Sequence, residues 1–393
     1  MMRKDWKCYK LEEICEFISG LWTGKKPPFV TVGVIRNTNF TKECNLDDSD
    51  IAYIDVEEKS FLKKQLKKGD IIIEKSGGSD KQPVGRAILF NLEGDFSFSN
   101  FTTALRIKDI DLVYPQYLHK GLVAHYIHGE TKVMQSNTTG IRNLDITRYK
   151  NLLIFVPSLL EQKAIVAELD KLNEILAKKR EQLKELDRLG QAIFYDMFGD
   201  PILNEKNWEM VPFSYVGTFG RGVSKHRPRN AEELLGGTVP LIQTGDVARA
   251  NMYITEYVST YSEFGVAQSK IWKSGTLCIT IAATIGKCAI LTFDACFPDS
   301  VVGFVANSRV CTEYVYYIFG SIQNVLEENA PAVAQKNINL ATLKALRIPL
   351  PPLDTQKEFV NKILRVEKQK QKIKQSIVEV QQLLDYTMNK YFG

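Results

Sequence analysis

The sequence contains an internal repeat, and this repeat constrains the fold more than any other feature. Residues 157–199 align without gaps on residues 351–393, at a constant offset of 194 positions. Pro, Leu, Gln and Lys at positions 157, 159, 162 and 163 recur at 351, 353, 356 and 357, and both tracts end in Phe-Gly. Repetition on this scale predicts two tandem copies of one structural unit, which together account for all 393 residues.

The sequence upstream of the two tracts matches more weakly but in the same order. Trp6 matches Trp208, VGRAIL at 84–89 matches IGKCAIL at 285–291, and residues 140–157 match residues 333–351. Both upstream parts contain short β-branched and aromatic runs interrupted by Gly, Pro, Asn and Asp, a pattern typical of a mainly β domain with some helix. We therefore predict one such domain over residues 1–157 and another over residues 200–351.

Each repeated tract has the pattern of one long helix, over residues 158–199 and 352–393. Ser158 and Glu161 fit an S-x-x-E capping box, and Gly199 and Gly393 stand where a glycine favours the end of a helix. Apolar residues with alternating three and four spacing follow in both tracts: Ile165, Leu169, Leu172, Leu176, Leu183, Leu186 and Ile193 in the first, and Phe359, Ile363, Val366, Ile373, Ile377, Val380 and Leu384 in the second.

An apolar stripe over about 40 residues, hence about 60 Å of helix, is longer than a surface helix needs. Each helix could pack on its own domain alone, but two matched stripes in one chain favour mutual pairing. Antiparallel pairing would relate the two units by a pseudo-two-fold axis and place the two β domains at opposite ends of the helix pair. The predicted fold class is α+β, with two mainly β domains, each followed by a long helix, and the two helices paired as an antiparallel coiled coil.

Composition excludes several classes of protein. Hydrophobic residues make up 44% and charged residues 25% of the chain, as in an ordinary globular protein. The longest stretches without Asp, Glu, Lys or Arg are too short for a membrane span of about 20 residues, and the N-terminus lacks the apolar core of a secretory signal. We therefore expect a cytoplasmic protein. A net charge of +5 permits a polyanionic partner without requiring one.

Motifs for catalysis and metal binding are incomplete. The seven cysteines form no C-x-x-C pair, and His125 and His128 have no further ligand nearby, which disfavours a zinc site. Lys26-Pro27-Pro28-Phe29 resembles the motif of amino-methyltransferases, but a lysine cannot accept a hydrogen bond from the target amine. We predict no catalytic residue and no metal site.

The remaining candidate chemistry is hydrogen bonding from polar loops. Arg and Lys reach guanine acceptors, and Asn and Gln pair with adenine, although any solvated loop has the same inventory. The candidates for DNA binding are Asn37, Asn39, Ser76, Lys81, Gln82, Thr139, Arg142 and Asn143 in the first unit, and Lys225, Arg227, Arg229, Gln243, Thr244, Gln335, Lys336 and Asn337 in the second. Arg142-Asn143 and Lys336-Asn337 occupy equivalent places. On a two-fold frame such loops would face one side of a duplex, where half-sites one turn apart are about 34–36 Å from each other.

In these repeated tracts and polar loops, the chain resembles the DNA-specificity (S) subunits of type I restriction-modification systems. IFVPSLLEQKAIVAEL (154–169) and IPLPPLDTQKEFVNKI (348–363) look like the two conserved regions of that family. AQKNINLATLKALRIPLPP (334–352) and ITIAATIGKCAIL (279–291) look like its target-recognition domain. The first domain departs more from the pattern, because it has the longer LKKGDIIIEKSGGSDKQPVGRAIL at 66–89.

The resemblance implies that each β domain recognises one half of a split double-stranded DNA target and that the helices set the gap. Methyltransferase (M) subunits, which carry S-adenosylmethionine, would dock on the helices, and restriction/translocase (R) subunits would join, with ATP and Mg on partner subunits and no cofactor on this chain. The candidate spacer and partner residues are Gln162, Ile165, Leu169, Leu172, Gln356, Phe359, Ile363 and Val366. Two other classes stay open: a self-sufficient DNA methyltransferase or nuclease, and a coiled-coil interaction protein without DNA function.

Overall fold

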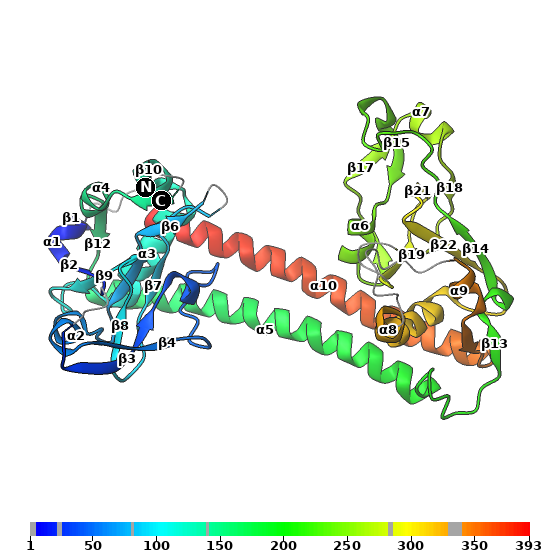
Figure 1. The fold of residues 1–393 in the computed structure, drawn as a ribbon, viewed down its shortest axis with the longest axis horizontal. Helices are drawn as coiled ribbons and strands as arrows, with labels where there is room; N and C mark the ends of the chain where they lie inside the picture. The colour runs from blue at the N-terminus through cyan, green and yellow to red at the C-terminus, as the bar shows by residue number, and fades with distance from the viewer. Residues whose placement is uncertain (1–4, 22–25, 80–81, 139–140, 282–285, 329–339) are drawn as a thin grey trace. The chain divides into compact units, whose positions relative to one another are not determined.

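The computed structural model describes residues 5–21, 26–79, 82–138, 141–281, 286–328 and 340–393. The chain forms two compact units, and neither is simply one copy of the sequence repeat. The first contains Met1–Arg180 together with Ser376–Gly393, and the second contains Glu181–Gln375. Each unit therefore combines one β-rich domain with the beginning of one long helix and the end of the other (Figure 1).

Two sheets build the centre of the first unit: a four-stranded antiparallel sheet in the order β2-β9-β5-β7 and a three-stranded sheet in the order β4-β3-β8. All four residues of β5, three isoleucines and a glutamate, are buried, as expected of a central strand. The strands are β2 (Cys15–Ser19), β3 (Phe29–Ile35), β4 (Ala52–Glu57), β5 (Ile71–Glu74), β7 (Ala87–Leu89), β8 (Phe96–Phe98) and β9 (Thr102–Ile107).

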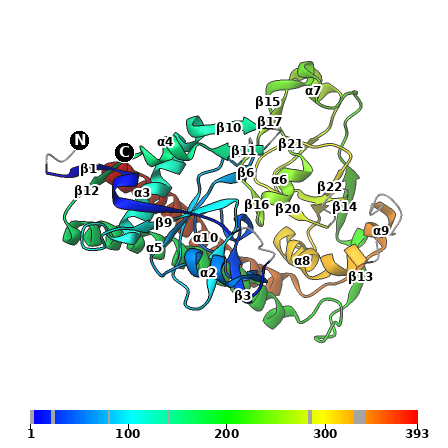
Figure 2. The same cartoon turned by 60° about the vertical axis from the view of Figure 1, so that its left-hand side comes forward.

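Helices and two smaller sheets complete the first unit. A third sheet has the order β10-β11-β6, and Figure 2 shows its strands side by side. Leu118 and Leu122 of helix α3 (Pro115–Ile127) pack in one cluster with Ile71 and Ile73. The other elements are α1 (Leu11–Ile14), α2 (Glu58–Lys64), α4 (Ile146–Lys150), β1 (Lys7–Lys10), β6 (Ser76–Gly78), β10 (Gln135–Thr138), β11 (Ile141–Leu144), β12 (Leu153–Val156) and the 3-10 helices η1 (Asn37–Asn39) and η2 (Glu130–Met134).

The second unit has a five-stranded sheet, β14-β22-β19-β20-β16, and a four-stranded sheet, β17-β15-β21-β18. Its strands are β13 (Met210–Pro212), β14 (Gly217–Arg221), β15 (Leu235–Leu241), β16 (Tyr253–Ile254), β17 (Ser259–Tyr261), β18 (Ile271–Trp272), β19 (Leu277–Thr280), β20 (Cys288–Leu291), β21 (Ala295–Cys296), β22 (Val301–Ala306) and β23 (Arg347–Pro349). Its shorter helices are α6 (Thr244–Arg249), α7 (Glu263–Ala267), α8 (Thr312–Glu328), α9 (Leu340–Ala345), η3 (Phe213–Tyr215) and η4 (Glu232–Leu234).

The two units share a plan, as the repeat predicts. In each, the first strand pairs antiparallel with the strand that directly precedes the long helix: β1 with β12, and β13 with β23. Trp6 and Trp208 precede these first strands at matching places. The duplicated sequence therefore corresponds to duplicated strand pairing.

The long helices are α5 (Leu159–Phe198) and α10 (Leu353–Phe392), each of 40 residues. The Oγ atom of Ser158 accepts a hydrogen bond from the N–H of Glu161 at 3.3 Å, and Gly199 has a φ of +74°, so both predicted ends of α5 are confirmed. No helix among the described residues combines the length and the apolar composition needed to cross a membrane.

Within each unit, the beginning of one long helix packs against the end of the other. In the first unit, Ile165 and Leu169 of α5 share an apolar cluster with Leu384 and Tyr391 of α10. In the second, Ile193 of α5 shares a cluster with three residues of α10, namely Phe359, Val360 and Ile363. Both sets of contacts are those expected of antiparallel neighbours.

Candidate nucleic-acid interface

One buried glutamine attaches each domain to the helix that follows it. Gln162 accepts a hydrogen bond from the N–H of Tyr114 at 2.8 Å and donates to the carbonyls of Leu112 and Pro157 at 2.8 and 2.9 Å. Gln356 makes the equivalent three bonds, with Cys311, Arg309 and Pro351. Buried amides bonded in this way orient a domain on its helix.

The helix residues predicted as spacer or partner contacts are all buried. Gln162, Leu169, Gln356, Phe359 and Ile363 have no exposed side-chain surface, and the largest exposed fraction in the set is 9%, at Leu172. The other two members, Ile165 and Val366, are buried as well. This burial fits a packing role between helices and domains.

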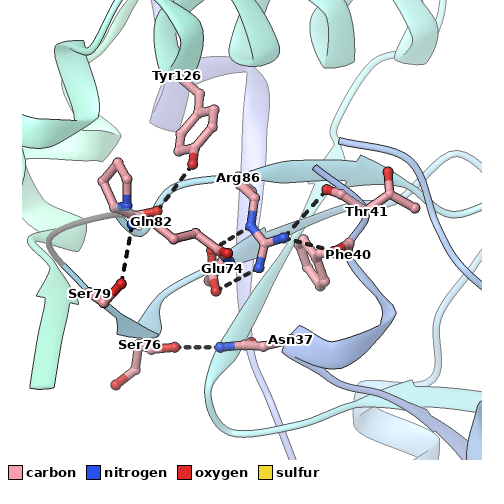
Figure 3. A network of polar contacts seen from close by, with 10 residues as sticks. Asn37, Phe40, Thr41, Glu74, Ser76, Ser79, Gln82, Arg86 and Tyr126 are labelled. Carbon is pink, nitrogen blue, oxygen red and sulfur yellow. Dashed lines mark hydrogen bonds and ion pairs between the residues drawn. The ribbon is translucent and has the colours of Figure 1, made fainter. Parts of the chain in front are cut away.

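In the first unit, three predicted DNA-binding residues from distant segments come together, and Figure 3 shows two of them, Asn37 and Ser76. Nδ2 of Asn37 donates to the carbonyl of Ser76 at 2.5 Å, and the hydroxyl of Ser76 donates to Oδ1 of Asn143. The pairing of β6 with β11 places Ser76 opposite Asn143 and Gly78 opposite Arg142. The structure thus brings these three residues together, and much of their polar capacity serves to hold the loops together.

Asn39 corrects one prediction directly. Its side chain is only 1% exposed, Oδ1 accepts from the N–H of Arg36 at 2.9 Å, and Nδ2 donates to the carbonyls of Asp47 and Asp50 at 3.1 Å each. A side chain whose hydrogen-bonding groups are used by its own loop has none left for a base. Asn39 therefore shapes the loop and is not a DNA-contacting residue in this structure.

The remaining candidates of the first unit lie beside this cluster. Arg142 and Gln82 are half-buried, and the turn containing Gln82 is closed by hydrogen bonds from its N–H to the carbonyl and the Oγ atom of Ser79. Lys81 and Thr139 lie outside the described residues.

An ion pair behind the cluster was missed by the sequence reasoning (Figure 3). The guanidinium of Arg86 binds the carboxylate of Glu74 through two N–O contacts of 2.9 and 3.0 Å, and the two side chains are 5% and 2% exposed. Arg86 also donates to the carbonyl of Phe40 at 2.7 Å. The repeat places Arg86 beside a matched glycine, but only the folded chain brings it to Phe40.

In the second unit, the predicted residues between 225 and 229 form an exposed basic loop. Arg229 contacts Asp299 at 2.6 Å and Arg227 lies 3.9 Å from the same carboxylate. The N–H of Lys225 donates to Oε1 of Gln268 at 2.6 Å. Two cationic side chains thus contact a single carboxylate, and Lys225 adds a third exposed cation to the loop, a charge excess suited to phosphate oxygens.

The second pair of candidates in this unit, Gln243 and Thr244, stands where β15 leads into α6. Gln243 is exposed. Strands β15 and β21 pair in parallel at Leu241 and Cys296, so the chain leaves both strands in the same direction, toward Gln243 and toward Asp299. Gln243 and the Asp299 partner of the basic loop therefore both follow the carboxyl ends of neighbouring parallel strands. Gln335, Lys336 and Asn337 lie outside the described residues.

Burial raises the pKa of the Cys44 thiol to about 11 and that of Cys15 to about 12, so both thiols stay protonated near neutral pH. No group of three or more His, Cys, Asp or Glu side chains suited to a metal ion occurs within the part of the chain that the structure describes.

Comparison with known proteins gives a consistent result. The family model described as type I restriction modification DNA specificity domain matches twice, over residues 3–187 and 205–382. The chain is 21% identical over 403 residues to a putative type I restriction enzyme MjaX specificity subunit of Methanocaldococcus jannaschii, covering 97% of this chain and 93% of that relative. It is 22% identical over 317 residues to the EcoBI specificity subunit of Escherichia coli, covering 70% of this chain and 65% of the relative.

Two solved structures share the fold over the whole chain. One comes from work on complex assembly and conformational transition of the type I R-M system, with a TM-score of 0.65, 17% identity and coverage of 100% of this chain and 98% of the other. The other is the S subunit of a type I restriction-modification system from M. genitalium, with a TM-score of 0.58, 14% identity and the same coverage.

Proposed function

This chain belongs to the type I restriction modification DNA specificity family, because the family model matches both of its halves, and on that premise we propose that it is the DNA-recognition and scaffold subunit of a type I restriction-modification complex. Each β-rich domain is a target-recognition domain that reads one half of a split target. Lys and Arg side chains hold phosphates, and polar loop side chains read bases. The protein acts in the cytoplasm, where it meets DNA and its partner subunits.

The chemistry belongs to the partners in this proposal. Methyltransferase subunits bring S-adenosylmethionine and receive the flipped adenine, and restriction subunits bring ATP and Mg. This chain holds no cofactor and catalyses no step. The curated relatives are specificity subunits by name, which supports the assignment.

The observation that carries the proposal is the duplication of the whole architecture. Two similar domains each sit on their own helix through the same three glutamine bonds. A further observation supports antiparallel helices as the spacer. Asp187 contacts Lys370 in the second unit, and Glu168 contacts Tyr391 in the first. From the first of these contacts to the second, the position on α5 falls by 19 residues and the position on α10 rises by 21. Opposite directions of this kind are what antiparallel helices require.

The test is methylation mapping of DNA from cells that contain the gene and its partner genes, compared with cells in which this gene is deleted. We expect a bipartite adenine-methylated site that disappears with the deletion. Incorporation of labelled methyl groups by the purified chain alone would instead indicate a self-sufficient methyltransferase. Absence of salt-dependent, sequence-selective DNA binding by the assembled complex would indicate a coiled-coil interaction protein.

A further inference from the structure

We propose that Arg86 and Glu74 are positioning residues that set the base preference of the first target-recognition domain. This inference rests on the proposed function. Neither residue is placed to touch DNA, because both side chains are at least 95% buried. Their effect reaches the candidate site through the backbone that Arg86 binds.

The ion pair links three segments that meet only in the folded domain (Figure 3). Glu74 ends β5, directly before the strand that carries Ser76, and Arg86 precedes β7. From this position Nη1 of Arg86 donates to the carbonyl of Phe40 at 2.7 Å. The chain that follows η1 is thus tied to the end of β5.

The same two segments are joined a second time at the candidate site itself. Asn37 of η1 donates to the carbonyl of Ser76, two residues beyond Glu74. His119 of α3 supports the loop further along, with Nε2 at 3.2 Å from the carbonyl of Cys44 and 3.1 Å from that of Ala87. Burial lowers the pKa of His119 to about 4, so the ring is neutral near pH 7 and its Nε2–H is the donor to both carbonyls.

The second domain shows that the turn itself does not need an ion pair. In the first domain the N–H of Glu74 donates to the carbonyl of Arg86, and the N–H of Gly85 donates to the carbonyl of Glu74. Thr280, Lys287 and Gly286 make the same two bonds in the second domain, where the Lys287 side chain is exposed. Equivalent backbones therefore form with Thr and Lys in place of Glu and Arg.

A buried ion pair is costly to desolvate, and removing one partner leaves an unpaired charge. Because the equivalent turn forms with a neutral Thr in place of the Glu, the distinctive contribution of the Arg86–Glu74 pair is the bond from Arg86 to the loop after η1. That bond limits how far Asn37 and its neighbours can move relative to Ser76. A rigid loop accepts fewer alternative bases, since each wrong base leaves polar groups unpaired.

The test replaces the pair with the residues of the second domain, as the double variant Glu74→Thr and Arg86→Lys, in the full complex with its partner subunits. Methylated sites are mapped, and the base frequencies of each half-site are compared with those of the unaltered complex. We expect discrimination to fall about tenfold at one or more positions of the half-site read by the first domain. The other half-site keeps its sequence and serves as an internal reference.

The matched control is Arg106→Lys. Arg106 also binds a carboxylate through two contacts in the same domain, with Asp70 at 2.9 and 2.7 Å, but it donates to the carbonyl of Gln65 and not to the loop after η1. The control is expected to lower the thermal stability of the complex and to leave both half-sites unchanged. Relaxation of the same half-site by Arg106→Lys would mean that general loosening is the cause, and would overturn the inference.

The outcomes also separate this inference from the proposed function. If the unaltered complex makes no bipartite methylated site, the proposed function fails. If that site exists and the double variant keeps the full base preference of both half-sites, or relaxes both equally, the positioning role is wrong. Should the double variant fail to assemble, Arg86→Lys alone is the variant to test, because it keeps the positive charge beside Glu74 but lacks the several donors of a guanidinium. This single variant must relax the base preference of the first half-site for the inference to stand.

Discussion

At the scale of single residues, the polar groups of the candidate interface divide into those that hold loops and those that remain at the surface. Asn39 belongs to the first kind and Arg229 to the second, although both were predicted as DNA contacts on the same grounds. The difference lies in burial, 1% exposure at Asn39 against 45% for the Arg229 side chain. Residue type and loop position alone do not distinguish the two.

Gly77 is a position where one added side-chain carbon would change the candidate site. Its φ is +102°, and a Cβ at this position would lie 2.9 Å from Nδ2 of Asn37. Gly77→Ala is expected to destabilise the first domain by about 1–3 kcal/mol through backbone strain and displacement of Asn37. The matched control is Gly236→Ala, also at positive φ, where a Cβ would meet nothing within 4 Å. Thermal unfolding of the two variant complexes checks this, and an equal loss in both would show that the contact with Asn37 is unimportant.

Arg229 is expected to hold a DNA phosphate. If it does, Arg229→Ala weakens binding to all sequences. The negative slope of log K against log salt then becomes less steep by about 0.9. Titrations of the complex at several salt concentrations measure that slope. Lys273→Ala is the control, because Lys273 is an exposed lysine of the same unit, paired with Asp294 at 2.7 Å and outside the predicted site. A slope unchanged by Arg229→Ala would remove this residue from the interface.

At the scale of elements, the apolar stripe of the long helices is interrupted at two buried positions that the tertiary structure explains. Lys370 continues the three-and-four spacing of α10 yet is 5% exposed, and it is paired with Asp187 of α5 at 2.6 Å. Gly190 continues the stripe of α5, and a Cβ there would lie 2.5 Å from the hydroxyl of Tyr317 in α8. A search for apolar residues alone does not identify these two positions as buried, because the residues that bury them lie elsewhere in the chain.

The spacer role of α5 can be tested by inserting one helical turn of four residues between Arg180 and Glu181. This point lies between the two docked ends of α5, because the division between the compact units falls there. The gap in the methylated target is expected to grow by one or two base pairs, since four residues add about 6 Å of helix and a base pair rises about 3.4 Å. Both half-sites should keep their sequences. An unchanged gap would show that the helix does not act as the spacer.

At the scale of the whole molecule, each target-recognition domain binds the first-turn glutamine of its helix through backbone atoms. The groups that bind Gln162 are the N–H of Tyr114 and the carbonyls of Leu112 and Pro157, none of which depends on the side chain. A domain with different side chains at these positions can therefore form the same hydrogen bonds with the glutamine. This arrangement allows a domain to be exchanged as a block.

Exchange of residues 1–157 for the corresponding domain of another family member is expected to change one half-site and to leave the other half-site and the gap intact. The reciprocal exchange of residues 200–351 should change the other half-site, and it serves as the control. Methylation mapping of both chimeras gives the result. A chimera in which both half-sites change together would contradict separate reading by two domains.

The amino-acid sequence alone was sufficient for the duplication, the two helices with their ends, the mainly β domains and the family resemblance. These features depend on periodicity and on comparison of the chain with itself, which are present before folding. Three of the residues predicted from the sequence in the first unit, Asn37, Ser76 and Asn143, also meet in the structure.

Only the tertiary structure decided what each polar side chain does. Asn37 and Ser76 are 39 residues apart, Ser76 and Asn143 are 67 apart, and Arg86 and Phe40 are 46 apart, so their bonds have no local signature. The same holds for the compact units, each of which closes with the end of a helix that begins in the other. A hydrogen bond requires its two atoms to be within about 3 Å of each other, and for residues so far apart in the chain that proximity arises only on folding.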